Sequence, residues 1–396
     1  MRAYSAARVF STLAHSLLGA TFGWHVYDLT ASSLWLGVLG LVEFLPVVPA
    51  SLFGGALADN RDRRAIVSLA QGAACLAAAC LGLSTQAGLG SLGLLLATAF
   101  AVALARSFES PAGAALLPSL VPRALFPSAV VVSAIARNLG WVSGPVASGT
   151  IAAQAGLPAA YGAAALCFAA SIGLLYRLRT SDAVATRSPV SLGAIREGIS
   201  FVRTRPVILG SMSLDMFAVI FAGSTALLPI YAREILGVGL RGYGLLAAAL
   251  SIGTFAMTVL LLLRRPLERP GRALLAAVAV FGLATIAFGL SRSFALSVAA
   301  LIVAGMADEV SMVARSILIQ LSTPDALRGR VSSVSMVFIG ASNELGRAES
   351  GFLAGLTNPV FSVVFGGAAC LGVLGAVAWL VPGLSRYRVD AGAEPA

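Results

Sequence analysis

Residues 54–64 read Gly-Gly-Ala-Leu-Ala-Asp-Asn-Arg-Asp-Arg-Arg and place five charged side chains between two long apolar runs. The run before them, at about 34–58, and the run after them, at about 65–83, hold almost no charge. Each run is long enough to cross about 30 Å of hydrocarbon as a helix that rises about 1.5 Å per residue. The charged stretch is therefore predicted to be a short loop between two membrane helices.

Apolar stretches of this kind recur along the whole chain. The 396 residues are 58% hydrophobic and only 11% charged, which excludes a soluble globular protein. The spacing of the stretches leaves room for about twelve spans and too little polar sequence for a separate soluble domain. The predicted spans are 9–27, 34–58, 65–83, 90–112, 127–153, 158–176, 206–232, 242–263, 272–291, 294–318, 331–356 and 359–381.

The arginines predict how the spans are oriented. All 27 basic residues are arginine, and short cytoplasmic loops retain arginine whereas short external loops do not. If both termini are cytoplasmic, the arginines expected in external loops are Arg233, Arg241 and Arg292. We therefore expect a multi-pass protein of the cytoplasmic (inner) membrane with both termini in the cytoplasm. The net charge of +10 fits this topology and contact with anionic lipid, so no nucleic-acid partner is expected.

An internal repeat divides the chain near its middle. Val121–Leu125 recurs as Thr323–Leu327 at an offset of 202 residues, and the same offset relates Gly144 to Gly346. An offset of about half the chain is what two parallel halves of six helices would leave in a sequence. The expected fold is all-α and polytopic, with an N-terminal half at 1–179, a cytoplasmic linker at 180–205 and a C-terminal half at 206–396.

The charged loop resembles the loop signature of the major facilitator superfamily. That signature is a glycine, an aspartate four residues later and then a basic pair, which Gly55, Asp59, Arg63 and Arg64 match. Arg61 stands near the position of the first basic residue of the family pattern, while Asn60 and Asp62 depart from it. The resemblance implies that this loop takes part in gating.

The fifth span carries a second motif of the same superfamily. Gly140, Gly144, Pro145 and Gly149 resemble its antiporter motif, in which small residues let helices approach closely and a proline bends the backbone. The motif favours an exporter. Glycine and proline are also common in packed membrane helices, so helix packing is the alternative interpretation.

Further segments resemble the branch of the superfamily that contains enterobactin exporters. This resemblance implies proton-driven efflux of a small, partly hydrophobic molecule such as a siderophore or a drug, by a siderophore or multidrug antiporter. It does not identify the cargo, because one fold serves many substrates. The segments are Ala-Leu-Leu-Pro at 226–229, Gly-Tyr-Gly-Leu-Leu at 242–246, Arg-Gly-Arg at 328–330 and Ser-Asn-Glu-Leu-Gly at 342–346.

Other classes of function find less support. The sequence has no zinc-protease, intramembrane aspartyl-protease or phosphate-loop motif, so we expect neither an enzyme nor a cofactor or metal site. A proton-linked importer is the main alternative, and a channel is a weaker one. The expected partners are protons, a small-molecule cargo and membrane lipid. The oligomeric state stays open.

Ionisable side chains inside the spans are candidates for proton coupling, since such residues are costly in a membrane. Arg106 and Glu109 stand three residues apart and could form a neutral structural pair. Arg106 aligns with Asp308 under the repeat offset, which suggests a charge switch between the halves. His15 and His25 could relay protons or face their helix neighbours. The coupling candidates are Glu43, Asp215, Glu109, Asp308, Glu309 and Arg106.

Glu43 and Asp215 stand out among these residues. Each lies about nine residues into its span with no basic residue three or four positions away, so burial is expected to favour the protonated carboxyl. The alternative is a buried acid paired with an arginine of another helix, such as Arg137. Aromatic residues that could line an apolar cargo surface, or pack against lipid and helices, are Trp24, Phe44, Phe100, Phe217 and Phe221.

Overall fold

The computed structural model describes residues 2–47, 62–121, 125–178, 192–263 and 267–388. The regular elements in these ranges are helices, and the prediction of an all-α polytopic protein is confirmed. The chain divides into two compact units. Unit 1 is Met1–Val190 with Leu228–Ala248, and unit 2 is Ser191–Leu227 with Ala249–Ala396.

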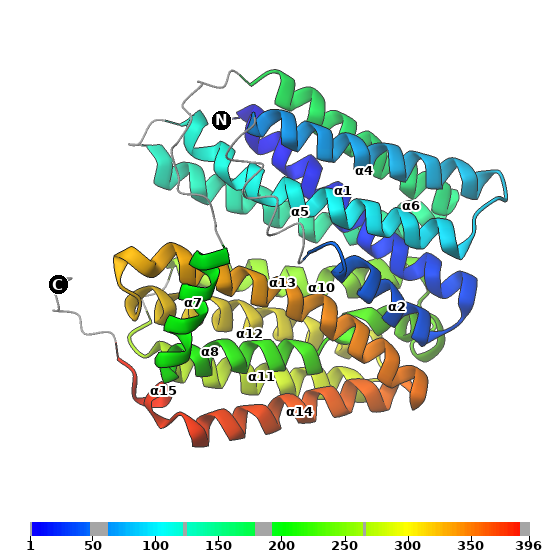
Figure 1. Cartoon of the computed structure of the whole chain (residues 1–396). Coiled ribbons are helices and arrows are strands. Elements are labelled where there is room, and N and C mark those ends of the chain that lie inside the picture. Colours follow the sequence, from blue (N-terminus) through cyan, green and yellow to red (C-terminus); the bar gives the residue numbers. More distant parts are fainter. Residues whose placement is uncertain (1, 48–61, 122–124, 179–191, 264–266, 389–396) are drawn as a thin grey trace. The chain divides into compact units, whose positions relative to one another are not determined.

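Unit 1 is a bundle of long helices with one short insert from later in the chain. The insert places the segment around Arg233 beside the C-terminal end of the first helix. The elements are α1 (Arg2–Thr30), α2 (Ser33–Phe44), α4 (Arg63–Gln86), α5 (Leu92–Leu120), α6 (Phe126–Tyr176), α9 (Leu228–Ile230), the π-helix η3 (Tyr231–Ile235) and the first part of α10 (Gly239–Leu263) (Figure 1).

Unit 2 holds the remaining helices around an apolar core that includes Leu214, Leu274, Leu318 and Cys370. The elements are α7 (Leu192–Thr204), α8 (Pro206–Phe221), the 3₁₀ helix η2 (Ser224–Leu227), the rest of α10, α11 (Pro270–Leu290), α12 (Phe294–Leu321), α13 (Asp325–Leu356), α14 (Pro359–Leu380) and α15 (Pro382–Arg386).

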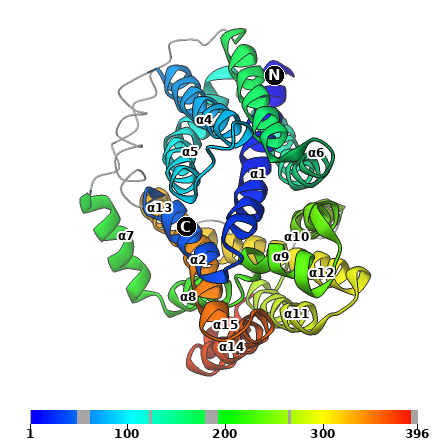
Figure 2. The ribbon, with the colours of Figure 1, turned by 90° about the vertical axis from the view of Figure 1, so that its right-hand side faces the viewer.

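Helix α6 contains two of the predicted spans, 127–153 and 158–176, and turns back between them. The turn is at Gly156, whose φ of +83° lies in the region that glycine adopts most readily. Both arms pack on α1 (Figure 2). The Ser148 and Thr21 hydroxyls lie 2.8 Å apart on the first arm, and Ser171 of the second arm donates to the Ala7 carbonyl at 3.0 Å. The two arms therefore run in opposite directions along α1.

The predicted span 206–232 is interrupted rather than continuous. Helix α8 ends at Phe221, and the chain passes through η2 before it joins unit 1 at Leu228. At the break, a Cβ atom on Gly223 would lie 2.5 Å from the carbonyl carbon of Gly346. The predicted continuous helix is therefore broken near Gly223, where the backbone lies in close contact with that of α13.

Several helices have the length and composition of membrane spans. In the part of the chain that the structure describes, eight helices are long and apolar enough to cross a membrane. This number counts Pro206–Ile235 once although α8 ends at Phe221, and Ser128–Tyr176 once although it turns at Gly156. Helices α1 and α13 are not among the eight, and both carry more polar side chains. The polar side chains of α1 form the site described next.

Candidate functional site

A buried polar cluster in unit 1 is centred on Glu109 of α5, which is 4% exposed. The Nε2 atom of His15 lies 2.8 Å from Oε2 of Glu109. Ser11 donates its hydroxyl to Oε1 at 2.5 Å, and Gln71 donates its amide to the same oxygen at 2.8 Å. We call these four residues, contributed by α1, α4 and α5, the Glu109 cluster.

Helix α1 supplies half of the cluster through a polar stripe. Tyr4, Arg8, Ser11 and His15 follow the spacing i, i+4, i+7 and i+11, which places them on one face of a helix. Tyr4 donates its hydroxyl to the Gly113 carbonyl of α5 at 3.2 Å, so this face is turned toward α5. The spacing of the stripe is present in the sequence, although the prediction for His15 as a proton relay did not include the other three residues.

The cluster places two titratable side chains in hydrogen-bond contact inside the helix bundle of unit 1. A buried carboxylate is costly unless it is hydrogen-bonded, and three side chains bond to Glu109. Phe168 covers His15 with a ring edge at a centroid distance of 4.9 Å. The imidazole and the carboxyl are both titratable groups, so the pair can take up or release a proton without moving far.

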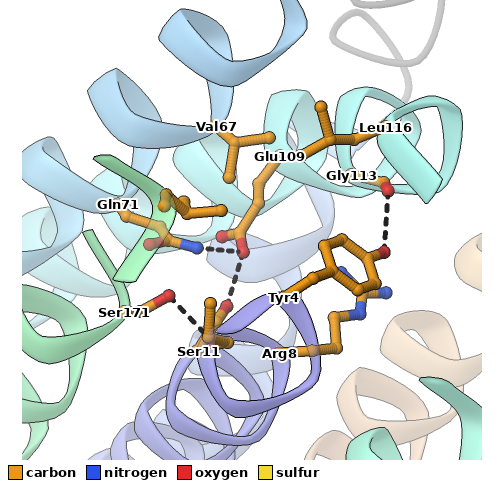
Figure 3. A pocket seen from close by; sticks show the side chains of 11 residues that line it. Tyr4, Arg8, Ser11, Val67, Gln71, Glu109, Gly113, Leu116 and Ser171 are labelled. Carbon is orange, nitrogen blue, oxygen red and sulfur yellow. Dashed lines mark hydrogen bonds between the residues drawn. The ribbon is translucent and has the colours of Figure 1, made fainter. Parts of the chain in front are cut away.

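A small cavity adjoins the cluster (Figure 3). Its volume is about 20 Å³, and its polar lining includes Arg8, Ser11, Gln71 and Glu109. Apolar side chains such as Val67 and Leu116 form other parts of the wall. Figure 3 shows the Gln71 amide and the Ser11 hydroxyl meeting at the carboxylate of Glu109.

Unit 2 contains a buried ion pair of another kind. Asp215 of α8 pairs with Arg315 of α12, and the two residues are 7% and 5% exposed. Of the two interpretations of Asp215, the structure therefore favours a buried acid paired with an arginine of another helix, and that arginine is Arg315. On the same helix, Glu309 accepts a hydrogen bond from Thr258 at 2.9 Å, next to the half-buried Asp308.

The two buried pairs have opposite polarity within the internal repeat. Each joins the first span of a predicted half to its fourth span, α1 to α5 in unit 1 and α8 to α12 in unit 2. In unit 1 the basic partner is on the first span and the acid on the fourth, whereas unit 2 reverses this order. The base of the unit 1 pair is a histidine, and the base of the unit 2 pair is an arginine.

Two other coupling candidates lie elsewhere. Arg106 is exposed on α5, and its guanidinium carbon lies 5.1 Å from the centre of the Trp141 ring. The hydrogen bonds to Glu109 come instead from α1 and α4, so the neutral pair of Arg106 with Glu109 is not what the structure shows. Glu43 is half-buried near the end of α2.

The predicted gating loop is described only at its end. Gly55, Asp59 and Arg61 lie outside the described residues. Asp62 caps α4 by accepting the Arg64 backbone N–H at 2.9 Å, as aspartate often does at a helix start. The Arg64 guanidinium donates hydrogen bonds to the carbonyls of Tyr176 and Leu178 at 2.8 and 2.9 Å. It thus gives partners to backbone carbonyls at the C-terminal end of α6. Arg63 is the first residue of α4.

The aromatic residues proposed for a cargo surface belong to four helices, three in unit 1 and one in unit 2. Trp24 is 8% exposed and packs on Tyr243 at a ring distance of 5.3 Å. Phe217 and Phe221 of α8 stack at 6.3 Å. Phe44 of α2 is half-buried, and Phe100 of α5 is 39% exposed. A cargo surface made of these side chains stays a prediction.

The glycines of the antiporter-like motif mark two close helix contacts in unit 1. A Cβ atom on Gly140 would lie 2.7 Å from Cβ of Thr12, and one on Gly144 would lie 2.6 Å from Cβ of Ser16. Gly149 faces α10, where its Cβ atom would lie 2.5 Å from the Leu240 carbonyl oxygen. Pro145 contributes its carbonyl oxygen to the same contact with α10. The motif thus packs α6 on α1 and on α10.

We expect Gly144→Leu to abolish transport more completely than it lowers the amount of protein in the membrane. The larger side chain would push α6 away from α1, at a packing cost of about 1–3 kcal/mol. Gly162→Leu is the matched control, because no atom lies within 4 Å of a Cβ added at that position of α6. Immunoblots of membranes and transport assays measure both effects. Equal proportional losses would indicate a packing role alone.

The C-terminal end of α1 contacts the insert of unit 1. The hydroxyl of Tyr27 donates to Glu234 of η3, and Arg233 forms an ion pair with Asp28 at 2.9 Å. The hydroxyl of Tyr243 donates to the Ala20 carbonyl at 2.8 Å. These bonds tie segment 228–248, which lies within the predicted C-terminal half, to the first helix of the chain.

Comparisons with known proteins agree with this architecture. The family model described as "Transmembrane secretion effector" matches residues 2–390. The chain is 25% identical over 392 residues to the enterobactin exporter EntS of Citrobacter koseri (strain ATCC BAA-895 / CDC 4225-83 / SGSC4696), a match that covers 98% of this chain and 93% of that protein. The enterobactin exporter EntS of Escherichia coli O1:K1 / APEC matches with the same identity and coverage.

Solved structures of transporters share the fold. An inward-facing bacterial homolog of the human lysosomal transporter Spinster superimposes with a TM-score of 0.71 at 15% identity, covering 98% of each chain. The nucleoside transporter NupG gives a TM-score of 0.66 at 14% identity, covering 98% of this chain and 100% of that one. A POT family transporter in complex with 5-aminolevulinic acid gives 0.73 at 13% identity, covering 97% and 96%.

Proposed function

Since the chain belongs to the transmembrane secretion effector family of major facilitator transporters, we propose that it exports a small, partly hydrophobic molecule in exchange for protons. The chain is a multi-pass membrane transporter, and its relatives and structural neighbours are transporters rather than enzymes. The direction of transport, the coupling ion and the cargo are the parts that we propose.

The Glu109 cluster is the observation that supports proton coupling. A secondary transporter driven by protons needs a buried group that exchanges protons with the two sides of the membrane in different conformations. Glu109 is buried, lies within hydrogen-bond distance of a second titratable group and borders a small cavity. A proton on this pair would favour one conformation, and its release to water would favour the other.

The cargo class and the direction rest on the family and its relatives. Two curated relatives are enterobactin exporters, which supports efflux of a siderophore-like molecule or of a drug of similar polarity. We place the protein in the cytoplasmic (inner) membrane with both termini in the cytoplasm. The halves 1–179 and 206–396 would rock about a central cargo site, with 180–205 as their linker. A proton-linked importer is the alternative.

Two measurements test the proposal. Mass spectrometry of the molecules that cells secrete and retain, with and without this protein, identifies the cargo. Inside-out vesicles that are acidified inside should then accumulate that cargo, because the proton gradient drives it in the export direction. Accumulation that requires right-side-out vesicles would instead establish an importer. Accumulation that is unchanged by a collapsed proton gradient would rule out proton coupling.

Glu43→Gln tests the second carboxyl group proposed as a proton carrier. Glutamine mimics a protonated carboxyl, so a carrier at this position would lose uphill transport and keep downhill exchange of cargo. We expect a smaller loss of uphill transport than for Glu109→Gln, because Glu43 is only half-buried. Proteoliposome assays of uphill transport and of exchange, in both variants, measure the difference. If Glu43→Gln lost all uphill transport and Glu109→Gln did not, the proton carrier would be Glu43 of α2.

A further inference from the structure

The cavity beside the Glu109 cluster contains polar atoms that lack partners. The Oε1 atom of Gln71 and the Nε atom of Arg8 are buried and have no hydrogen-bond partner among the residues that the structure describes. Gln71 itself is only 2% exposed, and both residues line the cavity. Buried polar atoms are almost always paired with protein or with ordered water, because leaving them unpaired costs free energy.

The size of the cavity fits one water molecule. Its volume of about 20 Å³ exceeds the roughly 10–15 Å³ that a single water requires. A bound water also needs two to four polar partners. Gln71 offers an acceptor and Arg8 offers a donor, and the carboxylate of Glu109 and the hydroxyl of Ser11 line the same space.

The position of the cavity links Glu109 to one end of unit 1. Helices α1 and α4 begin at that end, and α5 and α6 finish there. Tyr4 and Leu116 belong to the apolar cluster that fills this end, and the remaining wall is largely apolar. The polar stripe of α1 runs from Tyr4 past Arg8 to Ser11 and thus supplies a polar route through the apolar packing (Figure 3).

We infer that this cavity binds a water molecule that passes protons between Glu109 and the end of unit 1 that carries the N-terminus. The inference rests on the proposed proton coupling. In the release step the water accepts the proton of Glu109 and donates one to the aqueous side, so a single proton moves and the water is regenerated. The Arg8 guanidinium opposes a resident hydronium ion, which makes the water a conductor of protons and not a store.

Infrared difference spectra between alkaline and acidic buffer provide the test. They report the carboxyl stretch of protonated Glu109, and its absence in Glu109→Gln assigns the band. In the wild-type protein we expect this band to exchange its proton in D₂O within the mixing time, because water reaches the carboxyl group directly.

Two variants fill the cavity. A Cβ atom in Gly113→Ala would lie 3.1 Å from Nη1 of Arg8, and Ser171→Thr adds a methyl group to the lining while it keeps the hydroxyl. Gly173→Ala is the matched control on α6, because no atom lies within 4 Å of its added Cβ. We expect slow exchange and an uphill transport rate reduced by about tenfold in the first two variants, with downhill cargo exchange unchanged.

The outcomes separate this inference from the proposed function. Exchange as fast as in the wild type in both Gly113→Ala and Ser171→Thr would overturn the water route. Slow exchange with an unchanged uphill rate would overturn its role in transport. Full uphill transport by Glu109→Gln would instead contradict proton coupling at Glu109, whatever the cavity variants do.

Discussion

Glu109→Gln is expected to abolish proton-driven transport while the protein remains folded in the membrane. Glutamine has the shape of the protonated carboxyl group, and its amide oxygen can still accept from Ser11 and Gln71. The variant cannot release a proton, so the step in which the empty transporter resets would lose its coupling. Loss of a positioned acid or base typically costs about 10²–10⁴-fold in rate, and we expect uphill transport to fall by at least about 100-fold.

Proteoliposomes loaded with cargo measure this effect. An imposed pH gradient reports uphill transport, and exchange of labelled for unlabelled cargo without a gradient reports binding and alternation. We expect Glu109→Gln to fail the first assay and pass the second. Glu197→Gln, at an exposed position of helix α7, is the control for a carboxyl removed without loss of coupling. Uphill transport by Glu109→Gln at the wild-type rate would exclude Glu109 as the carrier.

The helices were predictable because the membrane restricts the choice of structure. Every backbone polar group must be satisfied inside hydrocarbon, so apolar stretches such as 65–83 and 272–291 can only be helices. They appear as α4 and α11. The break near Gly223 was not predictable in this way, because its apolar sequence continues without a charge and the close backbone contact there is with Gly346 of a helix far along the chain.

The partners of the buried charges were less predictable than the charges themselves. Spacing along one helix suggested that Arg106 would neutralise Glu109, but the rotation of α5 turns Arg106 toward Trp141. The partner His15 lies 94 residues away in the sequence. Asp215 likewise meets Arg315 only after α8 packs against α12. Such contacts depend on how each helix is rotated and packed, and this cannot be read from a single sequence.

The α1 stripe is the exception, since its spacing is local. Residues 4, 8, 11 and 15 share one face of an ideal helix, and an arginine and a histidine on that face favour its burial against protein rather than lipid. The sequence could therefore have indicated which face of α1 packs inside unit 1. It could not have indicated that Gln71 of α4 completes the cluster.

Arg315→Met should be the most destabilising single change proposed here. It leaves the carboxylate of Asp215 buried without its partner, and removal of one partner from a buried ion pair costs about 3–5 kcal/mol. We expect a strong loss of membrane abundance and of thermal stability in detergent, measured by fluorescence-detected size-exclusion chromatography after heating. Arg233→Met is the matched control. It breaks the exposed pair with Asp28, where about 0–1 kcal/mol is typical.

The double variant Asp215→Leu/Arg315→Met separates a structural role from a coupling role. Replacement of both partners removes the unpaired charge, so we expect abundance to return to near the wild-type level. If the pair is structural, the rescued protein also transports uphill, because Glu109 still carries the proton. Normal abundance without uphill transport would instead make Asp215 part of the coupling mechanism. Equal stability of Arg315→Met and Arg233→Met would contradict the burial argument itself, since burial is the property in which the two ion pairs differ.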